Sequence, residues 1–99
     1  MFTYFWEFIV HDETRRDFER IYGTAGEWVR LFQRSPAYLG TELCRDVANA
    51  GRYITVDRWK SQGDFDAFKD RWRGEFETLD QRCTALTSAE RLIAETESL

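Results

Sequence analysis

The chain has 99 residues, which suits one domain, and its apolar share of 42% and charged share of 32% are ordinary for a globular protein. Its formal net charge of −4, with acidic and basic residues interleaved, argues against a nucleic-acid partner, because phosphate binding needs clustered Lys and Arg. No apolar run approaches the roughly 18 residues of a membrane span. We also expect no signal peptide, and we expect Cys44 and Cys83 to stay reduced in a cytoplasmic protein, because their spacing fits no zinc or CxxC motif.

The first segment, Phe2 to Val10, is rich in aromatic and β-branched residues and predicts a strand. Apolar residues fall on both of its faces, which is typical of a central strand covered on both sides. A helix is then expected from Glu13, capped by Asp12. Its apolar residues recur at spacings of three and four as far as Phe32, and Gly23 and Gly26 predict a kink or an irregular stretch in its middle.

Ser35-Pro36 ends this helix, and two strands are expected at Tyr38–Asp46 and Arg52–Trp59. The short turn between them makes them an antiparallel hairpin. Ser61 caps a second helical region, whose apolar stripe runs from Phe65 to Leu86, and a last strand is expected at about Glu90–Glu97. The order strand, helix, strand, strand, helix, strand is the split βαβ pattern. It predicts one ferredoxin-like α+β domain over residues 1–99, with the first and third strands central in a four-stranded antiparallel sheet.

One layer of helices leaves the other face of such a sheet uncovered. On the first strand we expect Trp6, Phe8 and Val10 under the helices and Phe5, Glu7 and Ile9 on the uncovered face. On the third strand the purely apolar pair Ile54 and Val56 is expected under the helices. The uncovered face then carries the other four residues of this strand, which are Tyr53, Thr55, Asp57 and Trp59.

An uncovered face with so many apolar residues favours pairing with a second copy of the chain. Such a homodimer would bury Phe5, Ile9 and Trp59 and enclose polar atoms of Glu7, Tyr53 and Asp57 in a small-molecule pocket. A slip of one residue exchanges the two faces. In that case Tyr4, Trp6 and Phe8 would line the pocket instead.

Nearly the whole chain resembles the antibiotic biosynthesis monooxygenase (ABM) family of the dimeric α+β barrel superfamily. The resemblance is carried by residues 6–8, 22–28, 38–43, 45–46, 52–59, 61 and 79–83. It implies a homodimer with a pocket between sheet and helices, and, for some members, oxidation of phenolic or quinol substrates with O₂ without a cofactor. Haem-degrading relatives use an asparagine on the first strand and a histidine on a helix. Here Glu7 lies in that strand region and His11 is the only histidine, so haem degradation is disfavoured.

These observations define the candidate site residues. Glu7 is a candidate general base, with pairing to Arg58 or Arg91 as the structural alternative. Asp57 is the second candidate catalytic residue and, with Tyr53, would orient a substrate hydroxyl, unless both only form cross-strand hydrogen bonds. Phe5, Trp28, Trp59 and Phe68 are candidate contacts for a small aromatic ligand, although such residues are also typical of a core or a dimer interface.

No Gly-rich loop, metal motif or nucleophile elbow is present, so nothing supports a flavin, nicotinamide or metal site. The sequence therefore favours a cofactor-independent monooxygenase-like protein acting on a small aromatic or quinol compound. The alternative is a non-catalytic dimer that binds a small molecule.

Overall fold

The computed structural model describes all residues, 1–99, and its elements follow the predicted order. The strands are β1 (Phe2–Val10), β2 (Tyr38–Arg45), β3 (Arg52–Trp59) and β4 (Thr87–Glu97). The helices are α1 (Arg15–Tyr22), α2 (Glu27–Phe32), α3 (Gln62–Arg71) and α4 (Arg73–Cys83), with short 3₁₀ turns η1 (Asp12–Thr14) and η2 (Thr84–Leu86).

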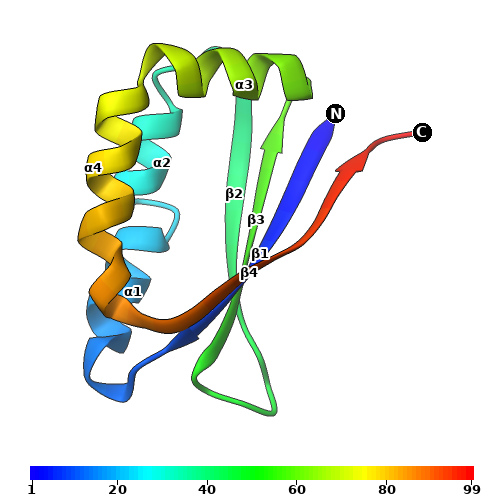
Figure 1. Cartoon of the computed structure of the whole chain (residues 1–99). Coiled ribbons are helices and arrows are strands. Elements are labelled where there is room, and N and C mark those ends of the chain that lie inside the picture. Colours follow the sequence, from blue (N-terminus) through cyan, green and yellow to red (C-terminus); the bar gives the residue numbers. More distant parts are fainter.

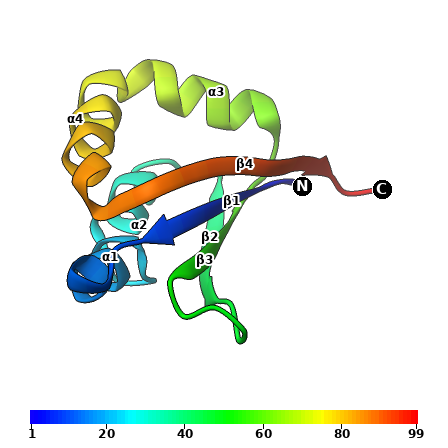
Figure 2. The same ribbon diagram turned by 60° about the horizontal axis from the view of Figure 1, so that its bottom comes forward.

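The four strands form one antiparallel sheet in the order β2-β3-β1-β4, so β1 and β3 are central as predicted. All helices lie on one face of this sheet, and the opposite face carries none (Figures 1 and 2). The ferredoxin-like α+β fold is thereby confirmed. None of the helices has the length and apolar character that crossing a bilayer requires.

The predicted irregularity in the first helical region is a complete break between α1 and α2 at residues 23–26. A side chain at Gly26 would meet backbone oxygens of Arg20 and Ile21 at 2.5 Å and 2.2 Å, so only glycine fits where the chain turns back against α1. The Ser61 hydroxyl accepts a hydrogen bond from the backbone N–H of Asp64, which is the predicted cap of α3. The last strand begins at Thr87, three residues before its predicted start.

The face prediction for β1 is correct, because its even-numbered residues are the ones buried under the helices. Phe2, Tyr4, Phe8 and Val10 are each at most 5% exposed. The face prediction for β3 is wrong by one residue. Tyr53, Thr55, Asp57 and Trp59 lie under the helices, and Ile54 and Val56 lie on the uncovered face.

The register between β1 and β3 explains the correction. Tyr4 pairs with Asp57 and Phe8 with Tyr53, and residues directly opposite each other in a sheet share a face. The sequence analysis placed the even-numbered residues of both β1 and β3 under the helices. In this register even-numbered residues of β1 face odd-numbered residues of β3, so the two assignments cannot both hold. Aromatic rings bury more apolar area than Ile or Val, so the mixed aromatic and polar set of β3 fills the space beneath the helices. The predicted one-residue slip of β1 does not occur. Tyr4, Trp6 and Phe8 line the cavity from the helix side, because the cavity lies between the sheet and the helices and not on the uncovered face.

Candidate functional site

A cavity of about 310 Å³ lies between the sheet and the helices of the single chain. Nine of its sixteen lining residues are hydrophobic, and most of these are aromatic. The mouth of the cavity is marked by the lining residues of α4 and β4 that are exposed, which are Asp80, Glu90, Leu92 and Glu95. The lining residues are Tyr4, Trp6, Phe8, Tyr22, Trp28, Phe32, Thr41, Thr55, Asp57, Phe65, Lys69, Phe76, Asp80, Glu90, Leu92 and Glu95.

Asp57 is the one carboxylate that is buried in this cavity. Asp57 is only 6% exposed. Thr41 lies opposite Asp57 in the β2–β3 hairpin, and the Thr41 hydroxyl donates a hydrogen bond to Asp57 Oδ1. Burial raises the pKa of Asp57 to about 6, while the bond from Thr41 and the charge of Arg58 partly oppose this rise. A carboxyl with such a pKa exchanges protons close to neutral pH, as a general base must.

Three further polar groups surround this carboxylate. The hydroxyls of Tyr38 and Thr41 share a hydrogen bond, so Tyr38, Thr41 and Asp57 form a connected chain. Tyr4 lies opposite Asp57 on β1, and burial, followed by the nearby Asp57 charge, raises the pKa of Tyr4 well above its usual value. Tyr4 therefore stays a neutral phenol, able to donate a hydrogen bond.

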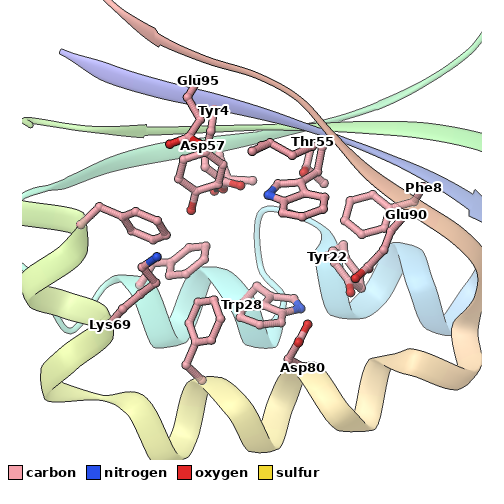
Figure 3. A pocket seen from close by; sticks show the side chains of 16 residues that line it. Tyr4, Phe8, Tyr22, Trp28, Thr55, Asp57, Lys69, Asp80, Glu90 and Glu95 are labelled. Carbon is pink, nitrogen blue, oxygen red and sulfur yellow. Dashed lines mark hydrogen bonds between the residues drawn. The ribbon is translucent and has the colours of Figure 1, made fainter. Parts of the chain in front are cut away.

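A single cation, Lys69, reaches the cavity from α3. Its ammonium lies 4.6 Å from the centre of the Phe65 ring, and no carboxylate is within ion-pair distance of it. Figure 3 shows Lys69 on the same side of the cavity as Asp57 and Tyr4, away from Asp80 and Glu90.

The structure brings two of the seven predicted site residues together in this cavity, Asp57 and Trp28. Tyr53, Trp59 and Phe68 lie next to it but contribute to the core instead. Trp59 is completely buried, with its ring centre 5.4 Å from Phe32 and 5.1 Å from Phe68. The Tyr53 hydroxyl donates a hydrogen bond to the Glu19 carboxylate on α1.

Glu7 and Phe5 lie on the uncovered face of the sheet, opposite the cavity. The Glu7 carboxylate pairs with Arg52 Nε at 2.6 Å and with Arg91 Nε at 3.3 Å. These hydrogen bonds, that of Arg52 first, lower the pKa of Glu7. The pairing with Arg91 was one of the expected alternatives, whereas Arg58 pairs with Glu42 at 2.6 Å.

Sequence reasoning missed Thr41, Tyr4 and Lys69 as groups around the carboxylate. For Thr41 a signal existed, because the short turn after Arg45 sets the hairpin register that places Thr41 opposite Asp57. For Tyr4 and Lys69 no local signal exists, since β1 and α3 reach the cavity only through the tertiary fold.

The sequence was also compared with known proteins. A family model described as antibiotic biosynthesis monooxygenase matches residues 1–79. The chain belongs to the antibiotic biosynthesis monooxygenase family. None of the curated proteins with which it was compared matches it. The matched residues contribute twelve of the sixteen residues that line the cavity.

Solved structures of ABM-fold proteins match over almost the full length of the chain. One is a candidate antibiotic biosynthesis monooxygenase from Bordetella bronchiseptica, with a TM-score of 0.76 and 16% identity, covering 99% of this chain and 96% of that one. Another is a variant of SnoaB, a cofactor-independent oxygenase from Streptomyces nogalater, with a TM-score of 0.76, 19% identity and coverage of 99% and 95%. At these identities the likeness shows the shared fold.

A third similar structure is a variant of MhuD with two manganese protoporphyrin IX molecules bound per active site. It matches with a TM-score of 0.74 and 20% identity, covering 100% of this chain and 95% of that one. In the present chain no histidine or cysteine lines the cavity, and the sole histidine, His11, is exposed just after β1. No three His, Cys, Asp or Glu side chains are grouped closely enough to hold a metal ion. The donor set of the cavity therefore does not fit axial haem ligation.

Proposed function

We propose that this member of the ABM family is a cofactor-independent monooxygenase that oxidises a small aromatic hydroxy compound. The observation that carries the proposal is Asp57, a buried carboxylate with a pKa of about 6 that faces an aromatic cavity. The likeness to SnoaB, a cofactor-independent oxygenase, supports the same reaction class.

Asp57 would take the proton of the phenolic hydroxyl. The resulting phenolate carries negative charge on the side of the cavity that holds the Lys69 ammonium and the neutral Tyr4 phenol, and both groups stabilise such an anion. The aromatic walls exclude water from this charge and hold the ring in place.

The phenolate would then react with O₂ at the ring carbon para to its oxygen. One electron passes to O₂, and the two radicals combine to a ring hydroperoxide, which receives the proton held by Asp57. Loss of that ring carbon's hydrogen with cleavage of the O–O bond releases water and leaves a carbonyl group. A para-unsubstituted phenol and one O₂ thus give one quinone and one water, so that no external reductant is required.

The test is oxygen consumption with 1-naphthol, with 1,4-naphthoquinone as the measured product. We expect Asp57→Asn to lose at least about a hundredfold in rate, the usual size of a general-base contribution. Glu7→Gln should retain the rate, because Glu7 is held by two arginines on the other face. If Glu7→Gln alone lost activity, Glu7 would be the base instead. If 1-naphthol bound to the wild-type chain without being oxidised, the protein would be a non-catalytic binding protein.

We also propose that the chain forms a homodimer through the uncovered face of its sheet. Phe5, Ile9 and Ile54 on this face are only partly buried, although no helix covers them. Pairing two copies would remove these side chains from water and stabilise the dimer in proportion to the apolar area buried. Sedimentation equilibrium at micromolar concentration is the measurement, and a monomer there would contradict the proposal.

A further inference from the structure

The end of the cavity farthest from Asp57 carries polar groups that the proposed reaction does not use. Trp28, on α2, is 8% exposed, and its indole Nε1–H makes no hydrogen bond of regular geometry, although Tyr22 and Cys83 lie beside it. Figure 3 shows this nitrogen turned toward the end of the cavity where Asp80 of α4 and Glu90 of β4 lie. A buried N–H without a partner costs free energy, so this donor is available to a ligand.

The charges at this end are unbalanced. Among the charged residues that line the cavity, only the carboxylates of Asp80 and Glu90 lie at this end. Figure 3 shows Glu95 and Lys69 at the other end, with Asp57. Ion pairs neutralise other acids of the chain, yet neither Asp80 nor Glu90 takes part in one. Burial and then the neighbouring charge of Asp80 raise the pKa of Glu90. The mouth of the cavity is thus a region of negative potential.

The donors and acceptors at this end restrict which chemical group can bind there. The Trp28 N–H needs an acceptor, whereas the Asp80 and Glu90 carboxylates need donors. A carboxylate on the ligand would accept from Trp28 but be repelled by both acids. An ammonium would satisfy the acids but offer nothing to Trp28. A neutral hydroxyl group both accepts and donates, and so matches all three side chains.

We propose that the cavity selects neutral aromatic diols, with one hydroxyl at Asp57 and a second between Trp28 and the two carboxylates, and that Asp80 and Glu90 exclude aromatic acids. The position of the first hydroxyl rests on the proposed function. The selection at the outer end is a property of binding and does not depend on turnover.

The test compares ligands with the same two-ring skeleton. 2,6-Dihydroxynaphthalene has a hydroxyl at each end, 6-hydroxy-2-naphthoic acid has a carboxylate at the outer end, and 2-naphthol has no outer group. Calorimetric titration at pH 7 yields the dissociation constant of each. For the wild-type chain we expect the diol to bind about tenfold more tightly than the acid, the size expected for one partly screened like-charge repulsion.

Two variants and a control assign the effect to residues. In the double variant Asp80→Asn with Glu90→Gln, affinity for the acid should rise about tenfold while that for 2-naphthol stays unchanged. Trp28→Phe should weaken the diol severalfold more than it weakens 2-naphthol, because only the diol has a hydroxyl to lose its bond from the Trp28 N–H, whereas both ligands lose the same ring contact. Glu77→Gln is the matched control, because Glu77 is an exposed acid of α4 outside the cavity.

Equal binding of diol and acid to the wild type, or a ratio unchanged by the double variant, would overturn the inference, as would failure of all three ligands to bind. The three ligands report binding only, because the ring carbon para to each hydroxyl is a ring-fusion carbon without hydrogen. Binding in the expected order, with no oxygen consumption on 1-naphthol, would support the inference while contradicting the proposed oxygenase, so the two failures are distinguishable.

Discussion

Thr41 and Asp57 lie opposite each other in the β2–β3 hairpin, and the Thr41 hydroxyl donates a hydrogen bond to the Asp57 carboxylate. This bond stabilises the ionised form of a carboxylate that is otherwise surrounded by aromatic rings. It therefore opposes the effect of burial on the Asp57 pKa, and the balance of the two keeps that pKa near neutral.

Thr41→Val removes the donor and nearly preserves the shape of the side chain. We expect the pKa of Asp57 to rise above about 6 by roughly one more pH unit, the effect of losing one hydrogen bond to a charged group. Titration of the Asp57 carboxyl carbon by NMR measures this change. The other groups near Asp57, which are Tyr4, Tyr38 and Arg58, stay in place. Thr41→Ser, which keeps a hydroxyl, should titrate like the wild type, and an unchanged pKa in Thr41→Val would show that the bond has no such effect.

The pKa of Asp57 also predicts how stability depends on pH. Its pKa is raised on folding from the ordinary 3.8 to about 6, so the folded chain binds more protons than the unfolded chain between these values. The stability associated with protonated Asp57 is fully present below pH 4 and is lost as the pH rises through 6. At pH 7, ionisation of the buried Asp57 therefore lowers the free energy of unfolding by on the order of 3 kcal/mol.

Asp57→Asn removes this titration and keeps a side chain of the same size. The free energy of unfolding is measured in urea at each pH for both proteins. The value for the variant minus that for the wild type should rise by roughly 2 to 3 kcal/mol between pH 4 and pH 7, because only the wild type loses stability as Asp57 ionises. A difference that is constant over this range would mean that Asp57 titrates normally in the folded chain.

Trp59 should matter for folding more than for binding, because it is completely buried between Phe32, Phe65 and Phe68 and does not line the cavity. We expect Trp59→Phe to lower the free energy of unfolding by about 2 kcal/mol, since a smaller ring leaves a void. The affinity for 1-naphthol should stay within twofold. A large loss of affinity with little loss of stability would identify Trp59 as a ligand contact, as the sequence suggested.

A charged group at position 54 tests the proposed dimer. Ile54 points to the uncovered face, where it pairs with Cys44 of β2 and Glu7 of β1. Ile54→Asp should convert the dimer to a monomer in sedimentation, because an unpaired carboxylate in an apolar interface must be desolvated. Val47→Asp, at a fully exposed position of the hairpin turn, should leave the assembly unchanged. A dimer in both variants would place the interface elsewhere.

Haemin should not form a ligated complex with this chain. No histidine lines the cavity, and burial raises the pKa of both Tyr4 and Tyr22, so that these phenols stay protonated and are poor ligands for iron. We expect no shift of the Soret band when one equivalent of haemin is added. A saturable shift at one haem per chain would contradict this.

Much of the fold followed from local patterns in the sequence. The bounds of β1 and β3, the break at Gly23–Gly26 and the Ser61 cap were all predictable, because each depends on residues within a few positions of one another. The order of these elements then determined the sheet topology, since right-handed crossovers leave one arrangement for a split βαβ chain.

The site depended on relationships that no local pattern contains. The sequence singled out Asp57, but its side of the sheet follows from the pairing of β3 with β1, which are joined only through helices and a second strand. The same register places Tyr4 beside Asp57, and the packing of α3 and α4 over the sheet adds Lys69 and Asp80. The sequence by itself determined the elements and the family. The tertiary structure decided which carboxylate is buried against aromatic rings, and only that burial gives Asp57 the pKa that a base requires.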